Sequence, residues 1–276
     1  MSSFPYRSRW SWPMLLLLAL PALLPLLALP APRQAGAADL VELSDAEYQQ
    51  LTEVAARFDH IAIVAPAASS VGVWLVGGDR FGVVRIIHIT HGSARKVWQS
   101  KQLNGVVDEV IASDLDGDGL EEIIARTNVG NLYVWSMPQL TVRYESLNSD
   151  FKKIHAMCTG NLDDDGQYEL IVNADRRIYL LDGKNFSREF TSLDEYECTR
   201  MRCGDVDGDL YNEIVLNTGQ VINGRTGGVE WSDEVFGARM DLADVDGDGI
   251  PEVLSESDGA VLRIFDVDMR KEKHMQ

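Results

Sequence analysis

Asp244-Val-Asp-Gly-Asp-Gly-Ile-Pro-Glu252 is the last and most regular of four copies of one acidic motif. The three earlier copies are Asp114-Leu-Asp-Gly-Asp-Gly-Leu-Glu-Glu122, Asn161-Leu-Asp-Asp-Asp-Gly-Gln-Tyr-Glu169 and Asp205-Val-Asp-Gly-Asp-Leu-Tyr-Asn-Glu213. Successive copies start 47, 44 and 39 residues apart. A period of this size is typical of β-propellers and solenoids. The chain is therefore predicted to be a repeat protein.

The segments between the motifs read as short β-strands. After the first motif, apolar runs cover residues 122–126, 131–136 and 141–147, and a run at 154–158 leads into the next motif. Polar or glycine-containing turns separate these runs, and no long helical periodicity interrupts them. Four strands per repeat make one propeller blade. The predicted fold class is therefore all-β, a β-propeller of about five four-stranded blades.

A degenerate repeat precedes the four motifs and makes the first predicted blade. Its strands are expected at residues 60–65, 72–77, 81–90 and 94–99. The stretch Pro66–Ser70 stands where the acidic loop should be and contains no carboxylate, so this blade is expected to hold no metal. Asp79 falls outside every motif, in a predicted hairpin turn, and is expected to lie at the surface.

Residues 1–37 are predicted to be a signal peptide. Arg7 and Arg9 precede a long apolar run, and small residues follow that run up to Ala37, where cleavage is expected. Prolines interrupt the run, which favours a cleaved signal over the alternative, a membrane anchor of roughly 20 apolar residues. The mature protein is therefore expected to be secreted or periplasmic, without a stable membrane anchor.

The net charge excludes some classes of partner. The whole chain carries -18, and loss of Arg7, Arg9 and Arg33 with the signal peptide changes this to -18 minus 3, or -21. A strongly negative surface repels nucleic acid and anionic lipid, and it attracts cations. No nucleic-acid partner is expected.

The remaining segments complete the predicted organisation. The domains are a signal peptide at 1–37, an N-terminal linker and helix at 38–57, the propeller at 58–268 and a solvated C-terminal tail at 269–276. The helix is expected over 44–57, with Ser44 as its cap and Glu47 completing a capping box. Since little chain is left for a last outer strand, the ring could close with residues 39–43, or stay an open arc that a partner completes.

Three cysteines are present, and their spacing matches no zinc-binding pattern. Cys158, Cys198 and Cys203 are expected to act as small apolar residues in strands. An odd number leaves at least one thiol without an intramolecular disulfide partner, and the pairing stays open.

The spacing of oxygen-bearing side chains in the motif suits calcium. Positions 1, 3, 5 and 9 carry carboxylate or amide oxygens, and position 7 can offer its carbonyl oxygen. Calcium takes roughly six to eight oxygen ligands at ~2.3–2.6 Å, often including a bidentate carboxylate. The sequence shows no obvious counter-charge for the clustered carboxylates, so about four calcium ions are expected, one in each motif.

An EF-hand loop begins in a similar way, but it requires glutamate at position 12 and flanking helices. Position 12 here is Ala125, Val172, Leu216 and Ser255 in the four copies. The EF-hand interpretation is therefore excluded.

The motif resembles the VCBS and FG-GAP repeats, a family whose calcium-loaded blades also build the head of the integrin α-subunit. The resemblance covers about residues 58–266 and is specific at the motifs. It implies that calcium is held by Asp114, Asp116, Asp118 and Glu122; by Asn161, Asp163, Asp165 and Glu169; by Asp205, Asp207, Asp209 and Glu213; and by Asp244, Asp246, Asp248 and Glu252. Asn161 at position 1 and Leu210 at position 6 depart from the family, so their sites are expected to be weaker or more strained.

The sequence predicts a binding or structural protein and not an enzyme. It contains no nucleophile elbow, phosphate-binding loop or HExxH motif. The favoured function is an exported calcium-binding module whose propeller face binds a protein or glycan partner. The alternatives are a polysaccharide-active lyase or hydrolase on a propeller scaffold, as some VCBS-containing proteins resemble, and a calcium-dependent surface assembly protein.

Overall fold

The computed structural model describes residues 45–64, 72–90, 93–163, 165–233, 235–257 and 261–273. Within these ranges the chain forms helix α2 (Asp45–Ala55) and five four-stranded antiparallel sheets. The predicted all-β fold with five four-stranded repeats is therefore confirmed.

The strands of each sheet are consecutive in sequence. The first sheet contains β1 (His60–Val64), β2 (Val73–Gly78), β3 (Val84–Thr90) and β4 (Ser93–Gln99). The second contains β5 (Val107–Ser113), β6 (Glu122–Thr127), β7 (Leu132–Ser136) and β8 (Thr141–Glu145). The third contains β9 (Ile154–Gly160), β10 (Glu169–Ala174), β11 (Arg177–Leu181) and β12 (Arg188–Thr191). The fourth contains β13 (Met201–Gly204), β14 (Glu213–Leu216), β15 (Gln220–Asn223) and β16 (Val229–Ser232). The fifth contains β17 (Arg239–Ala243), β18 (Glu252–Ser257), β19 (Val261–Asp266) and β20 (Lys271–Lys273).

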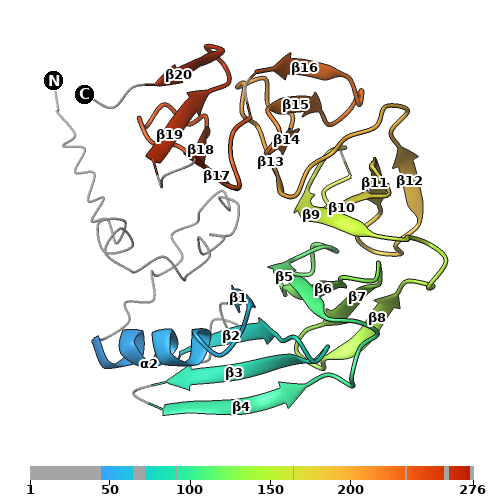
Figure 1. Cartoon of the computed structure of the whole chain (residues 1–276), viewed down its shortest axis with the longest axis vertical. Helices are drawn as coiled ribbons and strands as arrows, with labels where there is room; N and C mark the ends of the chain where they lie inside the picture. Colours follow the sequence, from blue (N-terminus) through green and yellow to red (C-terminus); the bar gives the residue numbers. More distant parts are fainter. Residues whose placement is uncertain are drawn as a thin grey trace, which may run out of the picture.

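The five sheets lie in chain order around a common centre (Figure 1). The first strand of each sheet, namely β1, β5, β9, β13 or β17, is innermost, and the fourth strand lies at the outer edge. Neighbouring first strands contact one another, as β1 does with β5, β9 with β13, and β13 with β17. This radial arrangement places equivalent loops of different sheets at equivalent positions.

The hydrophobic core lies between neighbouring sheets. Val76 and Ile86 of the first sheet pack in one cluster with Ile123 and Trp135 of the second. Similar clusters join the second sheet to the third, the third to the fourth and the fourth to the fifth. Burying one such aliphatic side chain stabilises the fold by about 1.5–3 kcal/mol. The second strands of the second, third and fourth sheets lie between neighbouring sheets, and every residue of β6 and β10 is buried.

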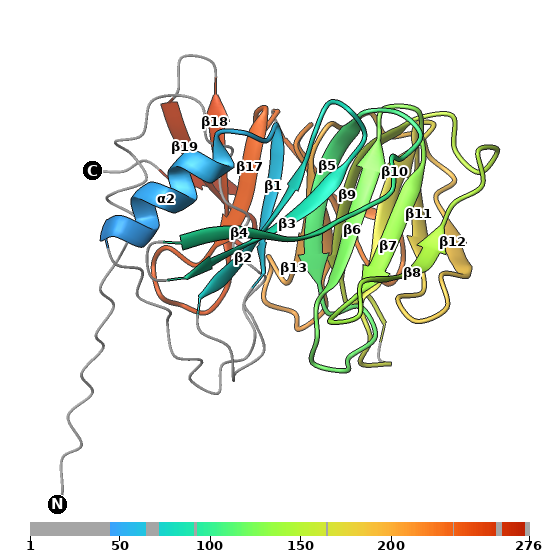
Figure 2. The same cartoon turned by 90° about the horizontal axis from the view of Figure 1, so that it is seen from below.

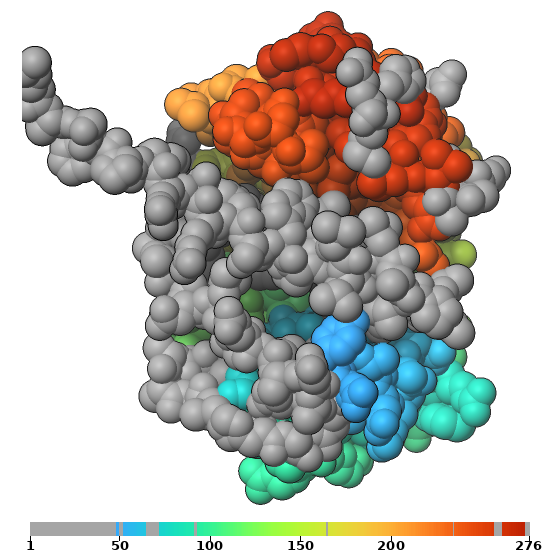
Figure 3. Space-filling view, turned by 90° about the vertical axis from the view of Figure 1, so that its left-hand side faces the viewer, coloured from blue at the N-terminus to red at the C-terminus, as the bar shows by residue number. Residues whose placement is uncertain are grey.

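The helix predicted over 44–57 is present as α2, and it packs on the first sheet. Val54 and Ala55 pack against Val73, Leu75 and Ile89. Figure 2 shows α2 lying across the strands of this sheet, and Figure 3 shows it beside the first sheet with the fifth sheet at the opposite end. Ser44 and the side chain of Glu47, the predicted capping pair, lie outside the described residues.

The C-terminal segment differs from the prediction. Residues 271–273 form β20, which pairs with β19, so the prediction of a solvated tail was wrong for these residues. Three residues are enough because the ion pairs of Lys273, described below, fix the short strand to the sheet. Residues 39–43, considered above for ring closure, lie outside the described residues.

The first sheet confirms the four predicted strands, but Asp79 is not a surface residue. Its side chain is buried and forms an ion pair with Arg85. It also accepts hydrogen bonds from the backbone N–H groups of Phe81 at 2.9 Å and Val83 at 3.0 Å. Asp79 therefore organises the turn between β2 and β3. The stretch Pro66–Ser70 lies outside the described residues.

Two further predictions concern the cysteines and the N-terminal segment. Cys158 and Cys198 are buried in an apolar cluster, and Cys203 packs against it. All three are free thiols, and burial raises their pKa values above the ordinary range. The predicted signal peptide, residues 1–37, lies outside the described ranges. Within those ranges, no helix has the length and apolar character needed to cross a membrane.

Candidate metal centres

Each acidic motif forms the loop between the first and second strands of a sheet. We name these loops by their sheets: the second-sheet loop (114–122), the third-sheet loop (161–169), the fourth-sheet loop (205–213) and the fifth-sheet loop (244–252). The glutamate at position 9 is the first residue of the second strand in every case. Each of these four glutamates is at most 3% exposed.

Backbone donors shape the four loops in the same way. The N–H of position 2 donates to the position 9 carboxylate at 2.6–3.0 Å. The N–H of position 5 donates to the position 3 carboxylate at 2.8–3.3 Å. The N–H of position 7 donates to the position 5 carboxylate at 2.8 Å. Aspartate side chains favour such local hydrogen bonds to the backbone, so the alternating aspartates hold the loop in a tight turn.

Position 6 explains why the motif favours glycine. Gly119, Gly166 and Gly249 adopt φ angles of 87°, 79° and 94°, which L-residues with a side chain rarely adopt. Leu210 holds the same position in the fourth-sheet loop with φ of 75°, and its side chain is 87% exposed. Leu210 therefore adopts an unfavourable backbone conformation that burial does not offset, and the weaker metal site stays a prediction.

Three acidic side chains gather at one point in each loop. Their oxygens lie within 4.8 Å of one another in the groups Asp114, Asp116 and Glu122; Asp163, Glu169 and Glu189; Asp205, Asp207 and Glu213; and Asp244, Asp246 and Asp248. The predicted ligands outside these groups are Asp118, Asn161, Asp165, Asp209 and Glu252. Asn161 accepts a hydrogen bond from Asn212 Nδ2 at its carbonyl oxygen, at 2.6 Å. Glu189 was not among the residues selected from the sequence.

A residue of the fourth strand lies at each loop, and sequence reasoning missed all four. The pairing of β8, β12 and β16 with the third strands skips one residue, which is Arg143, Glu189 and Glu230 respectively. A β-bulge of this kind re-aims a side chain. The equivalent skipped residue of β4 is the uncharged Val97. In β20 the pairing is regular, and Lys273 takes this role.

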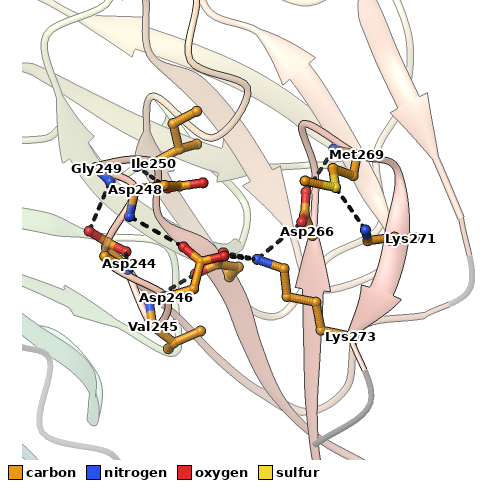
Figure 4. Close-up of polar contacts among 12 residues, drawn as sticks. Asp244, Val245, Asp246, Asp248, Gly249, Ile250, Asp266, Met269, Lys271 and Lys273 are labelled. Carbon is orange, nitrogen blue, oxygen red and sulfur yellow. Dashed lines mark hydrogen bonds and ion pairs between the residues drawn. The ribbon is translucent and has the colours of Figure 1, made fainter.

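Lys273 occupies the fifth-sheet loop (Figure 4). Its Nζ lies 2.6 Å from Asp246 Oδ2, 2.5 Å from Glu252 Oε1 and 3.1 Å from Asp266 Oδ2. Burial lowers the pKa of Lys273, but its hydrogen bonds to the three carboxylates outweigh this and raise the pKa. The expectation that these carboxylates have no counter-charge in the sequence was therefore wrong for this loop.

Arg143 occupies the second-sheet loop in a similar way. Its Nη1 lies 2.8 Å from Asp116 Oδ2 and 3.2 Å from Glu122 Oε1. The other end of the guanidinium donates to the carbonyl oxygen of Lys184 at 3.0 Å, and the group lies 5.5 Å from the centre of the Phe186 ring. Burial still raises the pKa of Glu122 to about 7, although Arg143 acts in the opposite direction.

The fourth-sheet loop has an acidic residue in the same place. Burial raises the pKa of Glu213 to about 8, and the negative charges of Asp207, Asp209 and Glu230 add to this effect. Glu213 Oε1 is buried without a hydrogen-bond partner in the described part of the chain. A cavity of about 150 Å³ lies beside the loop, and its lining includes Asp207, Glu230 and Arg270. No ion pair joins a Lys or Arg of the described ranges to the carboxylates of this loop.

In the third-sheet loop, no ion pair joins a Lys or Arg of the described ranges to Asp163, Asp165 or Glu169, and Asp164 lies outside these ranges. Burial raises the pKa of Glu169 to about 7, and the charges of Asp163 and Asp165 add to the effect. Burial likewise raises the pKa of Glu189, again reinforced by nearby aspartates. The third- and fourth-sheet loops therefore concentrate negative charge, whereas the second- and fifth-sheet loops contain their own cation.

The chain matches no protein-family model, and no curated protein matches its sequence. Among solved structures it is similar to the V. cholerae biofilm matrix protein Bap1, with a TM-score of 0.54 and 16% identity, over 75% of this chain and 37% of Bap1. It is also similar to BBS1N, solved in complex with ARL6DN, with a TM-score of 0.55 and 13% identity, over 78% of this chain and 66% of BBS1N. Both are β-propeller-like proteins. The fold is β-propeller-like. The chain spans less than two thirds of the length of either neighbour. Because the sequence identities are low, the similarity concerns the fold alone.

Proposed function

We propose that the protein is an exported calcium-binding β-propeller module that serves as a binding or structural platform for a protein or glycan partner. The observation that carries this proposal is Glu213, which is 0% exposed and whose Oε1 has no hydrogen-bond partner among the described residues. An oxygen of Glu213 lies within 4.8 Å of oxygens of Asp205 and Asp207. A buried acceptor left unpaired costs about 1–3 kcal/mol, and more if it is charged. A cation among these three carboxylates would remove that cost.

The donor set favours calcium over other divalent ions. The acidic groups offer oxygen alone, with no histidine or cysteine in any of the four groups. Zinc and copper prefer nitrogen or sulfur ligands, and magnesium requires a tighter octahedral shell near ~2.1 Å. Asp205, Asp207, Asp209 and Glu213 would hold the ion, and the carbonyl of Tyr211 at position 7 could complete the shell. When bound, calcium would neutralise the buried carboxylates and connect the first strand to the second.

A platform role fits the scaffold. Loops on a rigid framework are where binding residues usually lie. Bap1 is a biofilm matrix protein and BBS1N is solved as a complex with ARL6DN, so the neighbours are themselves structural or binding proteins. The predicted signal peptide and the negative charge of the mature chain support export and a calcium-rich environment. We propose no enzymatic activity.

Calcium binding is tested on the full-length protein by isothermal titration and by thermal melting in calcium and in EGTA. At calcium one hundredfold above its dissociation constant, each independent site adds about 2.7 kcal/mol of stability. Chelation should lower the melting temperature, and magnesium at the same free concentration should restore little of it. An unchanged melting curve in EGTA, together with no heat of calcium binding, would overturn the calcium proposal.

Export and partner binding need separate experiments. N-terminal sequencing of the protein from the periplasm or culture medium should find a chain that begins after Ala37, and an intact N-terminus in the cytoplasm would contradict export. A glycan array and a pull-down from the native secretome, each in calcium and in EGTA, should give calcium-dependent retention of a partner. Retention that is equal in EGTA would argue against a calcium-organised binding face.

A further inference from the structure

The same place in four sheets carries side chains of opposite charge. Arg143, Glu189 and Glu230 are the extra residues of equivalent β-bulges, and Lys273 lies at the corresponding edge of the fifth sheet. The acidic loops that they face share one motif and one hydrogen-bond pattern. The sheets therefore differ mainly in the charge that the outer strand brings to the loop.

We infer that this outer-strand residue determines which loops take a free divalent cation. In the third and fourth sheets, Glu189 and Glu230 complete sites for calcium. In the second and fifth sheets, the tethered cations of Arg143 and Lys273 stand in place of the ion. The inference rests on the proposed calcium-binding function and specifies which sites carry it.

The fourth-sheet loop gives the main evidence that an acidic outer-strand residue completes a calcium site. The Glu230 carboxylate lines the same cavity as Asp207, and its charge acts on both Asp207 and Glu213. Glu213 Oε1 is left without a partner among the described residues. A cation bound between these negative groups would offset their mutual repulsion. In the third-sheet loop, Glu189 is itself one of the three grouped acids.

The contacts of Lys273 and Arg143 give the evidence that a tethered cation stands in place of the ion. Lys273 Nζ contacts Asp246, Glu252 and Asp266, which include two of the predicted calcium ligands. Arg143 contacts two predicted ligands of its own loop, Asp116 and Glu122. A calcium ion could use these carboxylates only after displacing the tethered cation. In these loops a tethered cation therefore offsets part of the negative charge without metal.

The test counts calcium ions bound per full-length protein by isothermal titration at pH 8. The wild-type protein should bind two ions, although its sequence contains four motifs. Lys273→Gln should bind three, because the carboxylates of the fifth-sheet loop become available. Arg143→Gln should also bind three, and it provides the same test if the first variant does not fold. Glu230→Gln should weaken one of the wild-type sites roughly tenfold, because calcium affinity follows the number of ligand charges.

Two controls separate charge from general disturbance of β20. Lys273→Arg keeps a cation in the loop and should still give two ions. Lys271→Gln removes an exposed lysine that contacts Met269 and, within the described ranges, no loop carboxylate, and it too should give two. Four ions in the wild-type protein, or no gain in folded Lys273→Gln and Arg143→Gln, would overturn the inference while calcium binding stands. No calcium binding by the wild-type protein would overturn the proposed function as well.

Discussion

The fourth- and fifth-sheet loops have nearly the same sequence and the same backbone bonds, yet they differ in charge balance. In both, the position 9 glutamate is buried and accepts from the N–H of position 2, at 3.0 Å from Val206 and 2.8 Å from Val245. Glu252 is paired with Lys273, whereas Glu213 Oε1 has no partner among the described residues. The motif thus determines where carboxylates gather. The fourth strand of the same sheet, about 20 residues later, determines whether a cationic or an acidic side chain lies beside them.

Removal of calcium should separate the two loops most strongly. In EGTA, the amides of the fourth-sheet loop should lose protection from hydrogen exchange, because about 2.7 kcal/mol per site is withdrawn there. The amides of the fifth-sheet loop should change little, since Lys273 stays in place. Hydrogen exchange followed by mass spectrometry on peptides covering 205–213 and 244–252 measures both in one sample. An equal loss of protection in both loops would remove the distinction between them.

Matched substitutions of the two buried glutamates should have opposite signs in EGTA. Glu213→Gln should raise the melting temperature at pH 8, because a neutral amide replaces a buried carboxylate and can still accept from Val206. Glu252→Gln should lower stability by about 1–3 kcal/mol, because Lys273 loses a charged hydrogen-bond partner. In calcium, Glu213→Gln should become destabilising, because it removes a ligand. Denaturant unfolding of both variants in each condition checks these signs, and a loss of stability in Glu213→Gln with EGTA would count against the comparison.

The pH dependence should also differ between calcium and EGTA. Folded Glu213 keeps its proton up to a pKa of about 8, whereas the unfolded chain loses it near the ordinary value of 4.5. The folded state therefore binds more protons between these values, and without calcium this glutamate makes stability fall as pH rises through that window. Calcium requires the deprotonated carboxylate, so its affinity should rise over the same window. Glu213→Gln should flatten both trends, and trends that persist unchanged in this variant would assign them to other groups.

The smallest effect is expected at position 6. Leu210→Gly should stabilise the fourth-sheet loop by up to about 1 kcal/mol, because it relieves a positive φ at a residue that buries little surface. The matched change in the fifth-sheet loop, Gly249→Ala, should cost about 1 kcal/mol, because an added Cβ meets nothing within 4 Å and only the φ of 94° opposes it. Thermal melting in calcium measures both changes, and a destabilised Leu210→Gly would mean that the leucine side chain has a role in packing.

The repeat made much of the fold predictable from sequence. The four motifs and one degenerate repeat located the five four-stranded sheets, and the aspartate alternation located the groups around Glu122, Glu169 and Glu213. The sequence shows that residues 143, 189, 230 and 273 are charged, but it does not show that their side chains point toward the acidic loops. For the first three, a β-bulge shifts the strand by one residue, and turn spacing does not reveal such a shift. Lys273 was missed because its segment was predicted to be a solvated tail and not a strand. Asp79 was misplaced for a related reason, because its partner Arg85 is brought to it by the turn that it organises.

The most direct test of the account is the position of calcium in crystals grown with the ion, located by its anomalous scattering. We expect one peak among Asp205, Asp207, Glu213 and Glu230, and a second beside Glu169 and Glu189. We expect no peak in the fifth-sheet loop, where Lys273 should remain paired with Asp246 and Glu252. A calcium peak in that loop with Lys273 displaced, or no peak beside Glu213, would contradict the account.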